Sequence, residues 1–181
     1  MKNISFILAF ITCSLFGFSQ KYWEQSNLSS SFDLTKSYRV AILPVTSTNM
    51  DLLKLENVSY NKITTELMAC SKFQIINKNQ VQQSINKFSY GVSGLNPNSY
   101  PELAKDLNAD ILLICELSSD KQLIKKKEIG TVLAYIQLLD MKNNATVVYS
   151  GKARAINPIS AEAETEYAIQ KALNKLVKAS K

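Results

Sequence analysis

The 181-residue chain contains no histidine, and this absence excludes more chemistry than any other feature of its composition. Histidine is the commonest general base and metal ligand of proteins, and neither a Ser-His-Asp nor a Cys-His catalytic arrangement exists without it. The sequence also lacks a CxxC pair, a P-loop and a GxGxxG fingerprint. We therefore expect a protein that is not an enzyme and that has no catalytic residues, metal site or cofactor.

Glycine and proline are also scarce, with five and four residues, so long flexible linkers are not expected. Apolar residues make up 46% of the chain, which is enough for a core and too much for a disordered protein. The net charge of +6 suits an acidic partner or a membrane surface, although solubility is the simpler explanation. No basic-aromatic motif is present, so nucleic acid is not an expected partner.

The first 20 residues have the pattern of a secretory signal peptide. Lys2 gives a positive start, residues 4–18 are almost continuously apolar, and small Ser19 precedes Gln20. The apolar run is shorter than the roughly 20 residues of a membrane-spanning helix, so we expect cleavage near Ser19 or Gln20 and a periplasmic protein. Cys13 lies in a poor lipobox context, and lipidation there is not expected.

The remaining chain divides into a polar, serine-rich segment at 21–36 and a domain at 37–181. We expect the first to be a flexible N-terminal tether. The domain keeps two cysteines, Cys70 and Cys115, in apolar surroundings. Buried free thiols are the expected state, with a disulfide as the alternative that an oxidising compartment permits.

The domain begins with a buried strand. The run Val40–Leu43 is apolar and branched and ends at Pro44. Periodicity and turn residues predict four further strands and four helices. The strands are expected at 38–45, 72–77, 111–117, 130–141 and 145–155, and the helices at 51–71, 77–88, 99–107 and 160–178. This order predicts an α/β fold: a single-domain two-layer or three-layer sandwich with a mixed sheet of four to five strands and flanking helices.

Alternation along the strands predicts which side chains leave the core. Residues 147, 149, 151 and 153 should face one way and residues 146, 150, 152 and 154 the other, so only one face needs burial. Glu116 and Cys115 should likewise lie on opposite faces, which argues against a shared catalytic site. Glu116 is expected at the exposed end of the sheet.

Two segments are candidates for contact with a partner. Residues 89–98 form the clearest loop, and residues 118–129 are expected to form a short, solvated hairpin tip with frayed strand ends. A charge run of this kind is also typical of simple solubility. The candidate partner-binding residues are Tyr90, Leu95, Lys121, Lys125, Lys126 and Lys127.

Four segments in order resemble the CsgG/LpoB-like superfamily, which includes the curli-secretion protein, the penicillin-binding-protein activator and the N-terminal domain of TolB. Their patterns are "vAvlpf", "f.vv.r..l...l", "a..lgaDyll.g.l" and "l.d..tg.vv". They match Val40–Val45, Phe73–Ile85, Ala104–Leu117 and Leu138–Val148, and the resemblance covers about residues 38–178.

The resemblance implies an exported, non-enzymatic accessory protein that binds another cell-envelope protein as a regulator or assembly factor. The alternative is a subunit of an outer-membrane secretion assembly. Two departures from the superfamily bear on this choice: the candidate insertions at 89–98 and 118–129 are too short for the amphipathic hairpins of the channels, and the lipobox is absent or degraded. Peripheral association with the outer membrane and homo-oligomerisation stay open.

Overall fold

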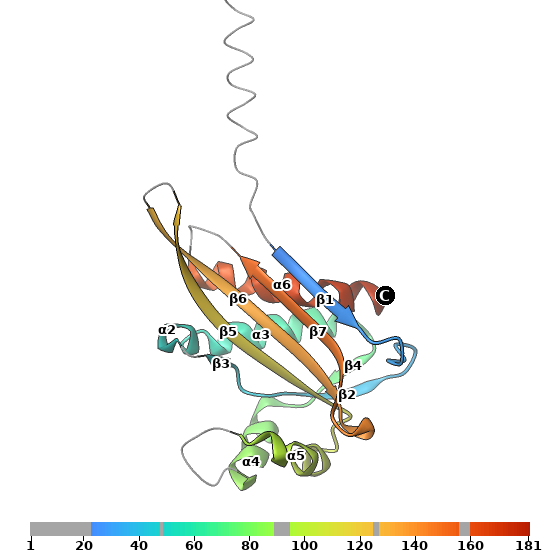
Figure 1. The fold of residues 1–181 in the computed structure, drawn as a ribbon. Helices are drawn as coiled ribbons and strands as arrows, with labels where there is room; N and C mark the ends of the chain where they lie inside the picture. Colours follow the sequence, from blue (N-terminus) through green and yellow to red (C-terminus); the bar gives the residue numbers. More distant parts are fainter. Residues whose placement is uncertain (1–22, 48, 89–94, 125–126, 156–159) are drawn as a thin grey trace, which may run out of the picture.

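The computed structural model describes residues 23–47, 49–88, 95–124, 127–155 and 160–181 (Figure 1). It confirms an α/β fold built on one mixed sheet. The expected signal peptide and Cys13 lie outside the described residues. Within them, no helix is both long and apolar enough to cross a membrane.

The sheet has seven strands in the order β1-β7-β6-β5-β2-β4, and β3 pairs with β5. β2, next to the edge strand β4, runs parallel to β4 and β5, whereas each neighbouring pair in the order β5, β6, β7, β1 is antiparallel. The strands are β1 Trp23–Leu28, β2 Tyr38–Ile42, β3 Thr46–Ser47, β4 Phe73–Ile75, β5 Ile111–Ile124, β6 Lys127–Asp140 and β7 Thr146–Ala155. The sheet is larger than expected because β1 and β3 join the five predicted strands.

The helices are α2 Met50–Leu53, α3 Glu56–Met68, α4 Lys78–Phe88, α5 Tyr100–Leu107 and α6 Ala161–Ala179, with short 3₁₀ turns η1 Pro97–Ser99 and η2 Met141–Asn143. The single helix expected at 51–71 is two helices, interrupted at residues 54 and 55. The last helix begins as predicted, because the Ser160 side chain accepts a hydrogen bond from the Ala163 amide.

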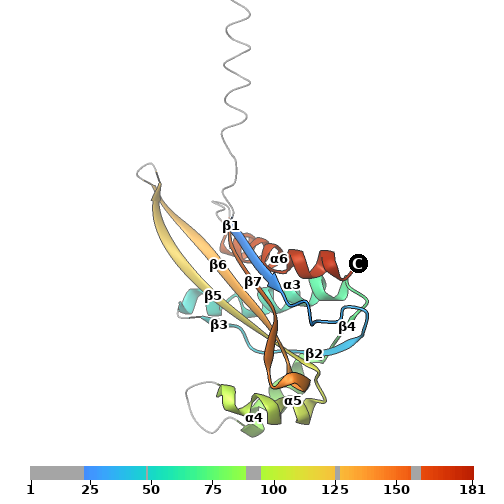
Figure 2. The ribbon, with the colours of Figure 1, turned by 45° about the vertical axis from the view of Figure 1, so that its right-hand side comes forward.

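The helices cover the two faces of the sheet unequally (Figures 1 and 2). On one face α3 and α6 pack along the strands and bury the larger apolar cluster, which includes Ile63, Ile136 and Leu173. On the other face α4 and α5 cover only the end of the sheet nearest β2, where Leu112 and Leu139 belong to a smaller cluster. The fold is therefore three layers thick at one end and two layers thick at the other.

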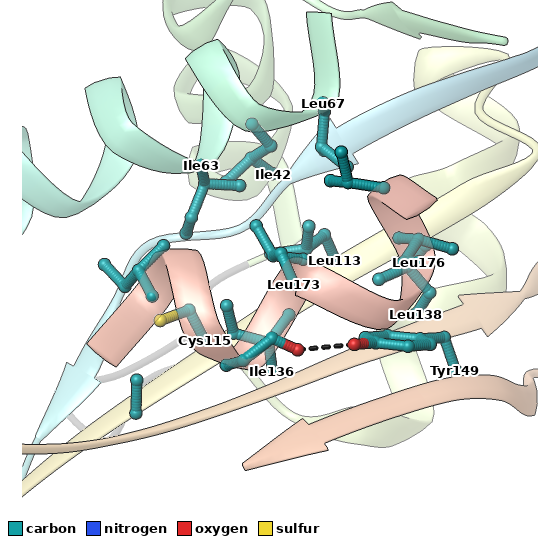
Figure 3. Packing of buried hydrophobic residues seen from close by; sticks show 14 of the residues in the cluster. Ile42, Ile63, Leu67, Leu113, Cys115, Ile136, Leu138, Tyr149, Leu173 and Leu176 are labelled. Atoms are coloured by element: carbon teal, nitrogen blue, oxygen red, sulfur yellow. Dashed lines mark hydrogen bonds between the residues drawn. The ribbon is translucent and has the colours of Figure 1, made fainter. Parts of the chain in front are cut away.

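The contact between β7 and α6 depends on two residues of β7 (Figure 3). Tyr149 is almost fully buried, and its hydroxyl donates to the Ala172 carbonyl in the middle of α6. Gly151 lies beneath the same carbonyl, and a Cβ at this position would collide with the oxygen. The glycine is thus required for the close approach of α6 to the sheet.

The prediction that residues 21–36 form a flexible tether is wrong for its first part. Residues 23–28 form β1, which pairs antiparallel with β7 along its whole length. Leu28 packs against the larger cluster, and Phe32 beyond it is only 7% exposed. The strand escaped prediction because polar side chains occupy most of both its faces: Glu24, on the α6 side, accepts a hydrogen bond from Asn174 instead of entering an apolar core.

The alternation predicted for β7 is confirmed from residue 149 to residue 154 and wrong at Val147. Tyr149, Gly151 and Ala153 are buried, whereas Val147 is 42% exposed. The pairing of β6 with β7 shifts between Leu138 and Leu139, so one extra residue of β7 is accommodated there. Such a bulge reverses the alternation on one side of it.

The cysteines are as expected. Cys70 and Cys115 are free and buried. Burial, together with the neighbouring charge of Glu116, raises the pKa of the Cys115 thiol to about 12. A thiol in this state is an inert core residue.

Candidate functional site

One side of the sheet is left uncovered where α4 and α5 stop. In Figure 1 this half of the sheet lies in front of α3 and α6, with no helix over it. We call it the open face. It consists of Trp23, Gln25 and Asn27 from β1, Ser150, Lys152 and Arg154 from β7, Leu133, Tyr135 and Gln137 from β6, and Ile114, Glu116 and Ser118 from β5.

The strand register arranges these side chains in rows. Residues directly opposite one another on paired strands point to the same side of a sheet. The middle row runs Gln25–Lys152–Tyr135–Glu116 across four strands. A second row runs Trp23–Arg154–Leu133–Ser118. The open face therefore has apolar and aromatic groups at its centre, and a cation and a carboxylate on either side of Tyr135.

Two shallow hollows lie over this face. The first, of about 170 Å³, is lined by Glu116, Ser118, Leu133, Tyr135 and Lys152. The second, of about 330 Å³, is lined by Gln25, Ser26, Asn27, Tyr135, Ser150 and Lys152. Both include Tyr135 and Lys152, so they lie next to each other across the strands.

The β1 side of the open face is aromatic and positive. Trp23, the only tryptophan of the chain, is 48% exposed. The Lys152 ammonium lies 6.0 Å from the centre of its ring, within the range of a cation–π contact. Arg154 is directly opposite Trp23 in the register. Glu116 gives the β5 side a negative charge; it is exposed as predicted, but it lies within β5 and not at the end of the sheet.

A second surface is formed by the outer rungs of the β5–β6 hairpin. Pairing between the two strands continues from Lys121↔Gly130 to Ile124↔Lys127, whereas β7 pairs with β6 only from Val132 onward. Among the described residues no third strand flanks these outer rungs. We call them the projecting ribbon; they are about 13 Å long at roughly 3.3 Å per residue, and their outer end reaches past the helices in Figures 1 and 2.

The ribbon corrects the prediction of a short hairpin with frayed ends. Both strands are 14 residues long. Their backbone ladder continues through a lysine-rich sequence because the pairing hydrogen bonds join main-chain groups, whatever the side chains. Charge patterning alone therefore predicted the end of β5 too early and the start of β6 too late.

The structure separates the predicted partner-binding residues. Lys121 and Lys127 belong to the projecting ribbon. Leu95 is half-buried and packs against the smaller apolar cluster, which includes Leu112 at the opposite end of β5. Lys125, Lys126 and Tyr90 lie outside the described residues. Leu95 therefore does not share a surface with Lys121 and Lys127.

The open face was not predicted as a site. The alternation of β7 did place Lys152 and Arg154 outside the core, and this was the available signal. Tyr135 and Leu133 were assigned only to the strand expected at 130–141, and Trp23 was assigned to the tether. Only the pairing of the strands brings these residues together.

The carboxyl end of β2, where many open α/β sheets bind a ligand, is already filled. The space there is about 10 Å³, room for a single water molecule. The Lys78 ammonium closes it, lying 3.2 Å from a Glu56 carboxylate oxygen and 2.8 Å from the Asn57 side-chain oxygen. In the part of the chain that the structure describes, no three His, Cys, Asp or Glu residues are grouped to hold a metal ion.

Comparison with known proteins gives structural matches only. No protein-family model matches the chain, and no curated protein matches it significantly. Two structures of the PelC dodecamer from Paraburkholderia phytofirmans are similar, with TM-scores of 0.53 and 0.55 at 13% identity. The first match covers 86% of this chain and 96% of that chain.

Lipoprotein GNA1162 from Neisseria meningitidis has a TM-score of 0.52 at 13% identity, covering 77% of this chain and 98% of that chain. The LpoB C-terminal domain from Escherichia coli is also among the matches, at 14% identity and a TM-score of 0.48, covering 70% of this chain and 87% of that chain. At these identities the likeness is one of fold. The chain therefore shares its fold with PelC and GNA1162, whose TM-scores exceed 0.5.

Proposed function

We propose that this protein is an exported, non-enzymatic accessory protein of the cell envelope that acts by binding another envelope protein. The projecting ribbon is the observation that carries the proposal. A two-stranded ribbon in water is at best marginally stable by itself, and the edges of its strands offer unpaired backbone groups to a partner strand. A protein partner that covers the ribbon would satisfy both requirements.

Further support comes from composition and from the matches in fold. The filled crevice at β2 and the absence of histidine favour binding over catalysis. The signal-peptide pattern of residues 1–20 favours export, and a protein of similar fold is a lipoprotein. The lysines of the ribbon region favour a partner that presents acidic side chains.

The test is crosslinking inside the cell. A photoreactive amino acid replaces Gln122, in the ribbon, or Gln83, which is exposed on α4. We expect Gln122 to give a covalent adduct with one other envelope protein and Gln83 to give none. Equal adducts at both positions, or none at Gln122, would contradict the proposal.

A second experiment measures the charge dependence of the same contact. Replacing Lys121, Lys125, Lys126 and Lys127 together by serine should weaken capture of the crosslinked partner without changing the urea unfolding midpoint. Unchanged capture by this variant would show that the lysines serve solubility alone. Turnover of any substrate that is lost in a Glu116→Gln variant would revive the enzyme class.

A second candidate function is that of a subunit in a homo-oligomeric envelope assembly. PelC, whose fold is similar, forms a dodecamer. Native mass spectrometry of the detergent-extracted protein distinguishes the two functions: a large ring of identical subunits supports the assembly, and a small species that carries a different protein supports the accessory role.

A further inference from the structure

We propose that the open face binds a second copy of this chain, with two strand rows facing each other across a two-fold axis. The surface is separate from the projecting ribbon, so this inference goes beyond the proposed function and does not depend on it. It rests on the order of charges in the middle row.

The two charged groups of that row form no ion pair with any residue that the structure describes. Glu116 and Lys152 are separated by Tyr135, which places them two strand spacings, roughly 10 Å, apart. Neither lies within ion-pair distance of an opposite charge in the described part of the chain. Lys152 contacts the Trp23 ring instead.

A two-fold axis along β6 makes this row complementary to itself. Rotation about an axis that passes over Tyr135 exchanges the β5 side with the β7 side. Glu116 of one copy then faces Lys152 of the other, and Lys152 faces Glu116, so both ion pairs form at once. Isologous contacts of this kind are the commonest in homo-oligomers, and sheets that pack face to face keep their strands within about 30° of each other.

The remaining residues fit the same arrangement. The axis places Tyr135 against Tyr135 and Leu133 against Leu133, which gives the contact an apolar centre. Serine and amide side chains surround that centre, as in the polar rim of protein interfaces.

The size of the face sets the expected affinity. It spans about 14 Å across the strands and about 16 Å along them at usual strand spacings. This footprint is smaller than the roughly 800 Å² per partner of a standard interface. We therefore expect a weak dimer that dissociates on dilution and in high salt, because its ion pairs are near the surface.

Charge reversal tests the pairing. Sedimentation velocity of the exported protein over a dilution series should show a dimer for the wild type. Glu116→Lys and Lys152→Glu should each raise the dimer dissociation constant by about tenfold or more, because each turns two attractive pairs into two repulsive ones. Both positions are at least partly exposed, so both variants should keep the wild-type circular dichroism spectrum.

Mixing the variants gives the decisive result. In a mixed dimer of Glu116→Lys with Lys152→Glu, both facing pairs are again of opposite charge, so an equimolar mixture should dimerise more tightly than either variant alone. The double variant should dimerise about as tightly as the wild type. A monomeric wild type, single variants with the wild-type dissociation constant, or a mixture that dimerises no better than the single variants would each overturn the proposal.

Two controls separate this inference from the proposed function. The ribbon lysine variant should remain dimeric, and Glu116→Lys should still crosslink to its envelope partner through Gln122. Loss of the crosslink with the dimer intact contradicts only the accessory role; loss of the dimer with the crosslink intact contradicts only the self-association.

Discussion

The same side of the sheet has a covered half and an open half, and the two differ in what lies over the strands. At the covered half, α4 and α5 bury Leu112 of β5 and Leu139 of β6 completely or nearly so. Four residues further along the same two strands, Glu116 and Tyr135 point to the same side of the sheet as Leu112 and Leu139, but no helix covers them. The comparison shows that a strand position becomes core or surface according to how far the neighbouring helices extend.

Truncation in each half tests this contrast most strongly. Leu112→Ala should lower the free energy of unfolding by about 2–5 kcal/mol, since it leaves a cavity beneath α4 and α5. Leu133→Ala, on the open half, should cost less than about 1 kcal/mol because its side chain already contacts water. Urea denaturation measures both. Equal losses would mean that the open half is covered in solution.

The opposite side of the sheet gives a second contrast, of smaller size. Gly151→Ala should cost about 1–3 kcal/mol, because the added methyl group must displace α6 from β7. Ser150→Ala is the matched control: the neighbouring side chain points to the open face, and its loss should be nearly neutral. Thermal unfolding of the two variants checks the difference, and a neutral Gly151→Ala would contradict the close approach of α6.

The stability of the α4–α5 layer over the sheet should depend on pH. The Ser84 hydroxyl donates to Asp106 at 2.5 Å and the Lys87 ammonium lies at 2.9 Å, and these contacts lower the pKa of Asp106. A pKa lowered on folding contributes stability above the unfolded value of about 3.9, and this stability is lost as the pH falls through the lower folded value.

Hydrogen exchange of the α5 amides at pH 6 and pH 3 measures this effect. Protection should fall at pH 3 in the wild type, and Asp106→Asn should be less protected already at pH 6. Glu102→Gln, at an exposed position of the same helix, should leave the exchange unchanged. Identical protection in Asp106→Asn and the wild type at pH 6 would show that the contacts of Asp106 with Ser84 and Lys87 do not hold α5 against α4.

The smallest effect is expected on the open half itself. Lys152→Met removes the cation near Trp23 and should change the tryptophan emission of the dilute protein, while the free energy of unfolding stays within about 0.5 kcal/mol. Lys105→Met, on exposed α5, is the control. An emission spectrum that is identical in the two variants would show that Lys152 does not contact the ring in solution.

Much of the fold could be predicted because buried strands and amphipathic helices leave periodic patterns. The apolar run Val40–Leu43 indicated β2, and α6 begins at its predicted cap. β1 could not be predicted, because it has no apolar pattern: its polar side chains form hydrogen bonds with α6, and its backbone pairs with β7. The length of β5 and β6 was underestimated for the same reason, since a ladder of main-chain bonds does not require apolar side chains.

The sequence by itself determined the class of the fold, because periodicity specifies strands and helices. It also excluded catalysis that uses an imidazole, because the chain contains no histidine. Only the tertiary structure decided which side chains share the open face. Glu116, Tyr135 and Lys152 are far apart in the sequence and become neighbours through strand register. That register depends on turns and a bulge, and the exposure of the row depends on where α4 and α5 end. Both are set by packing across the whole domain.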